Sequence, residues 1–313
     1  MSMKIVLPEK IDVLPQKYLD ELKGLGQVES YENFPIEDEE ILERIKDAEI
    51  LIVKWIYLPE NFLDVCKSLK YIVTLSSGYG QFPLKEARSK KIIIVNSPTH
   101  NSHAVAEHAV ALMFAVARGI FYAQDSIRKG NWKKTPYDFQ GVELAGKTLV
   151  QIGYGNIGKQ VAYIARGIGM KVVVANSKTT SKKLDEMISK ADLINLNIPL
   201  TEKTKNLIDK RRIGLMKKNA YLINTARGDV VDQEALYQAL VNEKIAGAGL
   251  DVFIGTPPVG KAPSGIMKLA NLKNVSTTPH LAFNTKEAGE RMGKEMLDNV
   301  KAIIKGNPIN VVN

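Results

Sequence analysis

The residues whose spacing points most directly to chemistry are three glycines in the sequence GYGNIG, residues 153–158. The run follows Thr148–Ile152, a stretch typical of a strand, and opens about Asn156–Ile168, a stretch typical of a helix. In that context the first glycine permits a tight turn, the second lets a pyrophosphate approach the backbone, and the third lets helix and strand pack closely. The helix N-terminus supplies free N–H groups and a partial positive charge for phosphates. The residues predicted to meet a dinucleotide are Gly153, Gly155, Asn156, Ile157 and Gly158. A glycine-rich turn without a ligand is the alternative.

The segment after the next expected strand, Lys171–Ala175, lacks the acidic residue that usually binds the ribose 2′-hydroxyl of NAD. It reads NSKTT at residues 176–180. A carboxylate would repel a 2′-phosphate, whereas Asn176, Ser177 and Lys178 can hydrogen-bond or pair with one. The segment therefore favours NADP over NAD as the cofactor. The alternative for Lys178 is an ordinary solvated surface lysine.

The elements that position these residues are short β-branched runs that alternate with helical stretches. A first series of expected strands comprises Lys4–Leu7, Glu49–Lys54, Tyr71–Leu75 and Ile92–Asn96. A second series comprises Thr148–Ile152, Lys171–Ala175, Leu193–Asn197, Ala220–Asn224, Ala246–Leu250 and Asn274–Thr278. The alternation predicts an α/β protein with two doubly wound parallel sheets, each covered on both faces by helices.

A long helical stretch, about Ser102–Lys129, joins the two series. Its segment Ala104–Ala117 is apolar on nearly every side, so it should be buried on nearly every side. It is expected to lie between domains or against a second subunit.

Length and composition exclude several classes of protein. The chain has 313 residues, 45% hydrophobic and 25% charged, which is ordinary globular usage and predicts two domains. The longest fully apolar run, Ala109–Ala117, is far shorter than the ~18–20 residues of a membrane span, and the N-terminus has no signal-peptide core. A single cysteine, Cys66, excludes internal disulfides and a cysteine-rich metal site. We expect a soluble cytoplasmic protein with no metal and no membrane partner.

The charge is lopsided, with 43 Lys and Arg against 34 Asp and Glu, a net charge of +9. The clearest basic segments lie apart in the chain, and no nucleic-acid motif surrounds them: Lys182-Lys183, Lys210–Arg212 and Lys217-Lys218. Each reads as a solvated face. We therefore expect no nucleic-acid partner, and the excess charge indicates at most a preference for acidic small molecules.

Four further stretches are more specific: LINTARGDVVD at 222–232, PTHNSHAVAEH at 98–108, GLDVF at 249–253 and TPH at 278–280. Together, and in this order, they resemble the D-isomer-specific 2-hydroxyacid dehydrogenases over essentially the whole chain. The resemblance implies a flavodoxin-like substrate domain of residues 1–98 plus 286–313. A Rossmann NAD(P)-binding domain, residues 99–285, would be inserted between its two pieces. It also implies a homodimer formed through the Ser102–Lys129 region.

The resemblance assigns the chemistry of keto-acid reduction to two residues. Negative charge develops on the carbonyl oxygen when hydride attacks the carbonyl carbon, so the site needs a fixed cation and a proton donor. Arg227 would grip the substrate carboxylate with its guanidinium fork, and His280 would donate the proton. Without the family, they would read as a surface arginine and a histidine at a strand end.

The same resemblance implies further contacts. Backbone N–H groups of Ser77 and Gly78 would meet the substrate carboxylate, and Lys54 would touch an anionic group of the substrate. The alternative for Lys54 is a solvated lysine at a strand end. Beyond the glycine loop and the segment after the second strand, the residues expected to bind the cofactor are Pro199, Thr204, Thr225, Ala226 and Asp251.

The sequence departs from the family at one position. The family's glutamate that hydrogen-bonds the histidine is replaced here by Thr256, and no Asp or Glu stands between Asp251 and Glu287. Threonine can orient an imidazole but carries no charge to stabilise its protonated form. We expect ketone reduction to favour lower pH than in relatives with the acid, unless another carboxylate such as Glu107 enters the site.

These observations predict an NAD(P)-dependent reductase of small 2-keto acids such as glyoxylate or hydroxypyruvate. Phosphoglycerate dehydrogenase is an alternative within the same class. An alternative of another class is an NAD(P)-binding, redox-responsive protein with weak or no catalysis, supported only by the missing glutamate.

Overall fold

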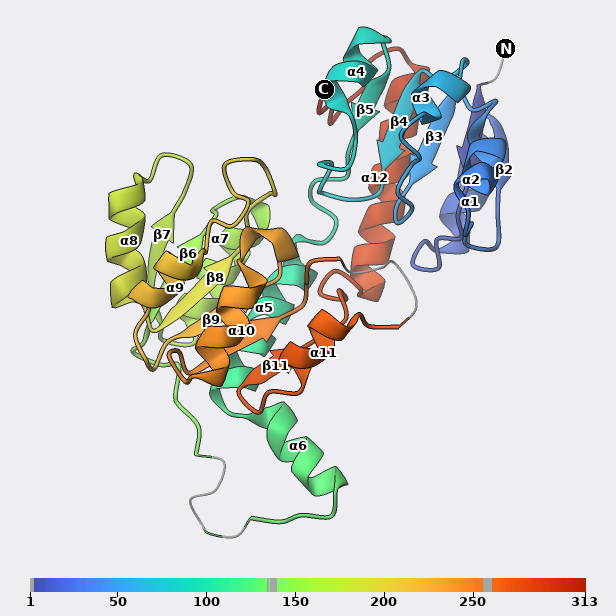
Figure 1. Ribbon diagram of the computed structural model, residues 1–313. Helices are drawn as coiled ribbons and strands as arrows, with labels where there is room; N and C mark the ends of the chain where they lie inside the picture. The colour runs from blue at the N-terminus through green and yellow to red at the C-terminus, as the bar shows by residue number, and fades with distance from the viewer. Residues whose placement is uncertain (1–2, 134, 136–139, 256–260) are drawn as a thin grey trace. The chain divides into compact units, whose positions relative to one another are not determined.

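The computed structural model describes residues 3–133, 135, 140–255 and 261–313, and the chain divides into two compact units (Figure 1). Unit 1 comprises Met1–Asn101 and Asn284–Asn313, and unit 2 comprises Ser102–Phe283. The second unit is therefore inserted into the first. These boundaries lie within three residues of the expected divisions at 98/99 and 285/286.

Unit 1 is built on a five-stranded parallel sheet with the order β2-β1-β3-β4-β5. Its strands are β1 (Lys4–Leu7), β2 (Gln27–Ser30), β3 (Ile50–Val53), β4 (Tyr71–Thr74) and β5 (Ile93–Val95). This is the flavodoxin-like order, as predicted. The sequence analysis missed β2, whose sequence QVES has no apolar run. It is an edge strand that pairs with β1 alone, and its side chains are exposed or only partly buried.

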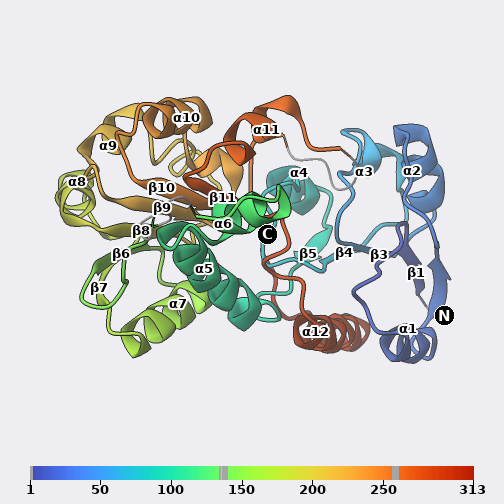
Figure 2. The ribbon, with the colours of Figure 1, turned by 90° about the horizontal axis from the view of Figure 1, so that it is seen from below.

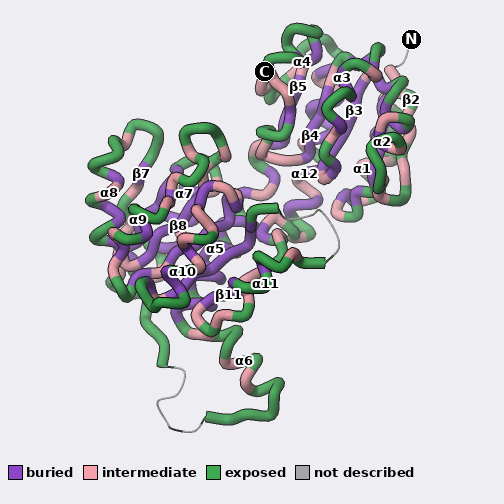
Figure 3. The backbone as a smooth tube through the Cα atoms, in the orientation of Figure 1, coloured by how far each residue is buried: buried purple, intermediate pink, exposed green. Residues whose placement is uncertain are grey.

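Helices cover both faces of this sheet, as Figure 2 shows. They are α1 (Gln16–Lys23), α2 (Asp38–Ile45), α3 (Phe62–Val65), α4 (Leu84–Ser89) and α12 (Lys286–Ile304). The strand β3 illustrates why: Leu51 and Val53 belong to one apolar cluster, and Ile50 and Ile52 to the other. Side chains alternate along a strand, so a run of four β-branched and leucine residues fills the cores on both sides. The tube in Figure 3 is accordingly purple along β3 and β4.

Unit 2 is built on a six-stranded parallel sheet with the order β11-β10-β9-β8-β6-β7. Its strands are β6 (Thr148–Ile152), β7 (Lys171–Ala175), β8 (Leu193–Leu196), β9 (Tyr221–Asn224), β10 (Gly247–Leu250) and β11 (Val275–Thr277). All six were predicted. The chain runs outward from β6 in both directions, so the strand order reverses between β6 and β8. In such sheets ligands bind beyond the carboxyl ends of the strands at this reversal.

The helices of unit 2 also lie on both faces of its sheet, with α5 and α7 on one side and α8, α9 and α10 on the other (Figure 2). They are α5 (Ser102–Ala117), α6 (Ile120–Arg128), α7 (Asn156–Gly167), α8 (Ser181–Lys190), α9 (Lys210–Leu215), α10 (Gln233–Val241) and α11 (Ser264–Ala270). A short 3-10 turn spans Gly228–Val230.

The long helical stretch Ser102–Lys129 is two helices rather than one. They meet at Gly119, whose left-handed φ of 60° ends α5, and their axes differ by 64°. The apolar helix α5 packs within unit 2 on α7, β9 and β10, and most of its residues are buried there. One stripe of the helix stays exposed, at His103, Glu107, Ala111 and Phe114, so the expectation of a contact with a second subunit stays a prediction. Among the described residues no single helix is long and apolar enough to span a membrane, and only the bent pair α5–α6 passes that test together.

Candidate active site

The glycine loop lies directly after β6, at the reversal of the strand order. Gly153 has a φ of 94°, and a Cβ there would lie 2.1 Å from the carbonyl oxygen of Asn197. A Cβ on Gly158 would lie 2.1 Å from the carbonyl oxygen of Gly153. A Cβ on Gly155 would meet no atom within 4 Å. The outer two glycines are thus required by packing, whereas Gly155 leaves the backbone open at the N-terminus of α7. This arrangement fits a dinucleotide pyrophosphate.

Buried amide side chains support the glycine loop through hydrogen bonds. The Gln151 side-chain N–H donates to the carbonyl oxygen of Gly153 at 2.9 Å, and Asn195 donates to the side-chain oxygen of Gln151 at 2.8 Å. Asn197 continues the chain by donating to the Thr225 hydroxyl at 3.1 Å. Sequence reasoning missed Gln151 and Asn195. Their signal was available, because each is a polar residue inside an otherwise apolar strand and must find hydrogen-bond partners when buried.

The segment after β7 forms a tight, exposed turn. The Asn176 side-chain oxygen accepts the N–H of Lys178 at 2.9 Å, and the Thr179 hydroxyl accepts the N–H of Asn176 at 3.0 Å. Asn176, Ser177 and Lys178 are all exposed. The turn therefore presents three polar side chains beside the strand that flanks the glycine loop.

The loop after β8 brings together two further predicted residues. The Thr204 hydroxyl donates to the carbonyl oxygen of Pro199 at 2.6 Å, and the Thr204 hydroxyl oxygen accepts the N–H of Thr201 at 2.8 Å. Thr204 therefore closes the loop that begins at Pro199.

Arg227 is carried on a turn that begins at the end of β9. Asn224 pins this turn twice: its side-chain oxygen accepts the N–H of Ala226 at 3.0 Å, and its side-chain N–H donates to the carbonyl oxygen of Arg227 at 2.9 Å. The half-buried Arg227 guanidinium donates to the carbonyl oxygen of Ala226 at 2.7 Å. Asn224 was not predicted, although it too is a polar residue at the end of an apolar strand. Thr225, which was predicted, is buried in the same turn.

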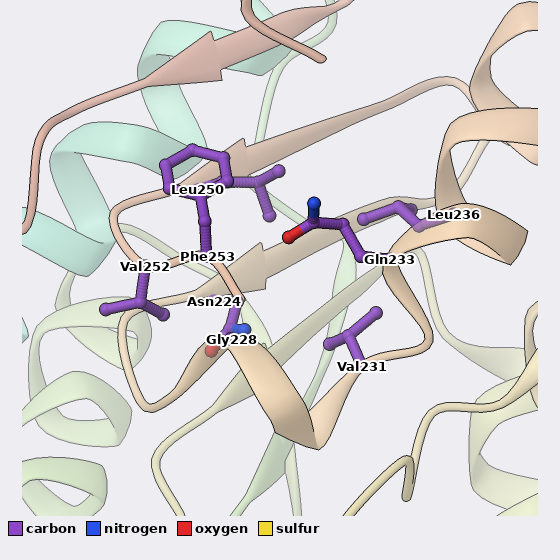
Figure 4. A pocket seen from close by; sticks show the side chains of 8 residues that line it. All are labelled: Asn224, Gly228, Val231, Gln233, Leu236, Leu250, Val252 and Phe253. Atoms are coloured by element: carbon purple, nitrogen blue, oxygen red, sulfur yellow. The ribbon is translucent and has the colours of Figure 1, made fainter. Parts of the chain in front are cut away.

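Behind this turn lies a small cavity of about 10 Å³, which Figure 4 shows from close by. It is lined in part by Gly228, Gln233 and Phe253. A Cβ on Gly228 would lie 2.1 Å from the carbonyl carbon of Phe253, and the Gln233 side-chain oxygen accepts the N–H of Ile254 at 3.0 Å. The cavity has room for about one water, so it is a packing gap that supports the Arg227 turn rather than a substrate pocket.

His280 lies beyond the end of β11 in a left-handed backbone conformation with a φ of 52°. Its N–H donates to the main-chain oxygen of Asp251 at 2.8 Å, and its ring meets Phe283 edge to face with 6.2 Å between centroids. Asp251 follows β10, which lies between β9 and β11 in the sheet. The carboxyl ends of three neighbouring strands thus carry Arg227, Asp251 and His280, and the sheet gathers these predicted residues at one edge.

The Asp251 carboxylate is 1% exposed and holds the chain around His280. It accepts the Thr278 hydroxyl at 2.6 Å and the N–H groups of Leu281 at 2.9 Å and Ala282 at 3.0 Å. The prediction for Thr256 lies outside the described residues. Glu107, the suggested substitute acid, is exposed on α5.

The predicted substrate residues of unit 1 lie at the carboxyl ends of β3 and β4. The N–H of Gly78 donates to the Ser76 hydroxyl at 3.3 Å, and Asn96 donates to the carbonyl oxygen of Ser77 at 3.0 Å. Lys54 is 9% exposed, and its ammonium donates to the carbonyl oxygen of Leu75 at 2.9 Å. The alternative of a solvated lysine is therefore wrong.

A buried carboxylate, Glu9, accompanies Lys54. Its Oε1 accepts the N–H groups of Lys54 at 2.6 Å and Trp55 at 2.8 Å. Burial lowers the pKa of Lys54 to about 8 and raises the pKa of Glu9 above its ordinary value. Sequence reasoning missed Glu9.

Among the described residues no group of three or more His, Cys, Asp or Glu side chains could hold a metal ion. The glycine loop, the two polar turns beside it and the Arg227–His280 edge together define a dinucleotide-dependent oxidoreductase site. A family model described as "D-isomer specific 2-hydroxyacid dehydrogenase, NAD binding domain" matches residues 110–282. The chain belongs to this family of NAD(P)-dependent oxidoreductases.

Known proteins are similar to this chain over most of its length. It is 38% identical to a glycerate dehydrogenase of Methylorubrum extorquens over 280 residues, which cover 88% of each chain. It is 37% identical to a D-3-phosphoglycerate dehydrogenase of Methanocaldococcus jannaschii over 96% of this chain but only 58% of that relative. Among solved structures, an acyclic imino acid reductase in complex with NADPH and D-Arg matches with a TM-score of 0.88 and 33% identity, over 99% of this chain and 100% of the other.

Proposed function

We propose that this protein reduces small 2-keto acids, of the size of glyoxylate or hydroxypyruvate, to the corresponding 2-hydroxy acids. The observation that carries the proposal is the placement of Arg227 and His280 at the ends of β9 and β11, on the same sheet edge as the glycine loop. The relative named glycerate dehydrogenase supports it, because dehydrogenation of glycerate at its 2-hydroxyl is the reverse of hydroxypyruvate reduction.

In this proposal the bound nicotinamide cofactor supplies the hydride for the carbonyl carbon. Arg227 binds the substrate carboxylate through its charged fork. Ser77 and Gly78 are the proposed substrate-binding residues of unit 1. His280 donates its proton to the carbonyl oxygen as negative charge develops there. The glycine loop holds the pyrophosphate. The further residues proposed to bind the cofactor are Pro199, Thr204, Thr225 and Ala226.

The cofactor is proposed to be NADP rather than NAD. The exposed turn of Asn176, Ser177 and Lys178 offers hydrogen-bond donors and one positive charge where a carboxylate would repel the 2′-phosphate. The NADPH complex of the related imino acid reductase is consistent with this preference.

The protein is further proposed to be a cytoplasmic homodimer that uses the Ser102–Lys129 region. The proposed contact surface comprises the exposed stripe of α5, which includes Phe114, and the helix α6, which extends away from the sheet in Figure 1. Apolar side chains of α6 are exposed: Ile120, Phe121, Tyr122 and Ile127. A large exposed apolar patch is typical of a subunit interface. Sedimentation of the full chain tests this proposal, and a monomer at micromolar concentration would contradict it.

The experiment that tests the activity is a panel of 2-keto acids assayed with NADH and NADPH in parallel. We expect turnover of glyoxylate and hydroxypyruvate, with NADPH the better reductant. Preference for NADH by more than about tenfold would refute the interpretation of residues 176–178. Oxidation of 3-phosphoglycerate well above that of glycerate would favour the phosphoglycerate dehydrogenase alternative. Tight nucleotide binding without turnover would favour a redox-responsive binding protein.

A further inference from the structure

A second histidine, His108, lies in a hydrogen-bonded chain that reaches the turn of His280. Its Nε2 is 2.9 Å from the Thr278 hydroxyl oxygen and 3.6 Å from Oδ1 of Asp251. The Thr278 hydroxyl donates its single proton to Asp251 at 2.6 Å. The threonine oxygen can therefore only accept from His108, so the imidazole must carry a proton on Nε2. The chain runs from the His108 N–H through the Thr278 hydroxyl to the Asp251 carboxylate.

The position of His108 follows from the way α5 packs on β10. A Cβ on Gly249 would lie 3.0 Å from the Cβ of Leu112, and a Cβ on Gly247 would lie 2.8 Å from Cγ2 of Val116. Two glycines two residues apart thus let the helix lie directly on the strand. Four helical residues rise about 6 Å, and two strand residues advance about 6.6 Å. One step further along this register places His108 at Asp251.

Asp251 in turn holds the segment that carries His280. Its side chain binds the N–H groups of Leu281 and Ala282, and its main-chain oxygen binds the N–H of His280 itself. A left-handed conformation at a histidine is uncommon and must be held by its surroundings. Asp251 is also the last acidic residue in the sequence before Glu287. It is the buried carboxylate available to stabilise charge near His280.

We propose that His108 is a positioning residue for the reduction, acting through Thr278 to hold the Asp251 carboxylate, and with it the His280 turn, in the geometry for proton transfer. This inference rests on the proposed function, because it assumes that His280 is the proton donor. Neutral His108 supplies a hydrogen-bond donor without neutralising Asp251, whose negative charge then favours the protonated form of His280.

The electrostatic surroundings of His108 agree with this role. Burial lowers its pKa below the ordinary value, although the nearby Asp251 acts in the opposite direction. On its own helix the neighbouring ionisable residues, His103 and Glu107, are exposed. The ionisable groups of the packed helix α7 are also exposed: Lys159, Tyr163 and Arg166. Strand β9 contributes Tyr221, and β10 and β11 contain no ionisable side chain. Asp251 is therefore the charged group that acts on His108.

The test compares the pH dependence of kcat/KM for reduction in matched variants of the full chain. His108→Leu and Thr278→Val each break the chain. We expect each to lower kcat about tenfold and to move the alkaline limb of the profile about 0.5 pH unit lower. His108→Gln and Thr278→Ser retain a donor or a hydroxyl, so they should stay near the parent protein. His103→Gln, at an exposed histidine of the same helix, is the control and should leave the profile unchanged.

Two further measurements separate positioning from simple loss of structure. Because His108 and Thr278 act in series, the double variant His108→Leu/Thr278→Val should be no slower than either single variant. Urea unfolding shows whether each variant stays folded. Partial unfolding lowers the amount of active protein, but it does not move the alkaline limb of the pH profile of the molecules that remain folded. An unchanged limb in folded His108→Leu, or additive losses in the double variant, would overturn the inference. His280→Asn distinguishes the two proposals: full activity in that variant would instead refute the proposed function.

Discussion

The two sheets have the same strand order at the point where the order reverses. They differ in the residues that follow the strand at this point. In unit 2, β6 lies between β7 and β8 and is followed by Gly153; in unit 1, β1 lies between β2 and β3 and is followed by Pro8 and Glu9. After β6, Gly155 leaves open space, with no atom within 4 Å of where a Cβ would stand. After β1, the corresponding space is occupied by the carboxylate of Glu9, which is 1% exposed.

The comparison shows how one topology serves two purposes. Backbone N–H groups at the carboxyl edge of a parallel sheet attract an anion. In unit 1 that anion is the Glu9 carboxylate, which takes the N–H groups after β3. In unit 2 the glycines leave the corresponding position for a phosphate. The presence of an internal carboxylate therefore explains why only unit 2 is expected to bind a dinucleotide.

The largest expected effect concerns the chemistry at the unit 2 edge. His280→Asn should lower kcat for reduction on the order of 10³-fold, because it removes the proton donor. Glu9→Gln, at the corresponding edge of unit 1, should lower kcat less than tenfold, because it keeps an acceptor oxygen for the same N–H groups. Steady-state kinetics with glyoxylate measures both. Equal losses of kcat in the two variants would contradict the proposal that His280 takes part in the chemistry and Glu9 does not.

The next effect separates packing from ligand binding within the glycine loop. Gly153→Ala should lower the free energy of unfolding by about 2–4 kcal/mol, because its φ is positive and its Cβ would clash with Asn197. Gly155→Ala should change that free energy by less than about 1 kcal/mol, since its Cβ meets open space. It should nevertheless weaken cofactor binding about tenfold. Urea unfolding and fluorescence titration measure the two quantities, and an unchanged affinity in Gly155→Ala would count against the pyrophosphate site.

The buried pair of unit 1 should be visible in the pH dependence of stability. The folded state releases the Lys54 proton from about pH 8, whereas the unfolded chain keeps it until near its ordinary pKa of 10.5. Between these values the unfolded state binds more protons, so the contribution of Lys54 to stability rises with pH. Between pH 8 and 9.5 the parent protein should gain on the order of 1–2 kcal/mol relative to Lys54→Met. Urea unfolding at the two pH values measures this difference, and a constant difference would show that Lys54 is not held in a buried site.

The smallest effect concerns cofactor preference. Lys178→Ala should reduce the ratio of kcat/KM for NADPH over NADH about fivefold, because one exposed cation contributes modestly to binding a 2′-phosphate. Lys182→Ala, an exposed lysine in the first turn of α8, is the matched control and should leave the ratio unchanged. The same ratio in the parent and in Lys178→Ala would assign the preference to other residues of the turn.

Local patterns predicted much of this molecule. The apolar runs located every strand of both sheets except β2, whose sequence QVES has no apolar run and whose side chains are exposed or only partly buried at the edge of the sheet. The glycine spacing located the loop after β6, and the motif around Arg227 located the turn after β9. The break between α5 and α6 was missed, because a single glycine at 119 is compatible with a continuous helix until packing bends the chain there.

The sequence by itself determined the two α/β units, the glycine loop and the family, because these depend on residues close together in the chain. Only the tertiary structure decided that Lys54 is buried with Glu9 and that His108 reaches Thr278. Glu9 and Lys54 are 45 residues apart and His108 and Thr278 are 170 apart. Contacts over such separations depend on which strands pair and on the register in which α5 packs on β10. Those arrangements are set by burial of whole faces, not by any local motif.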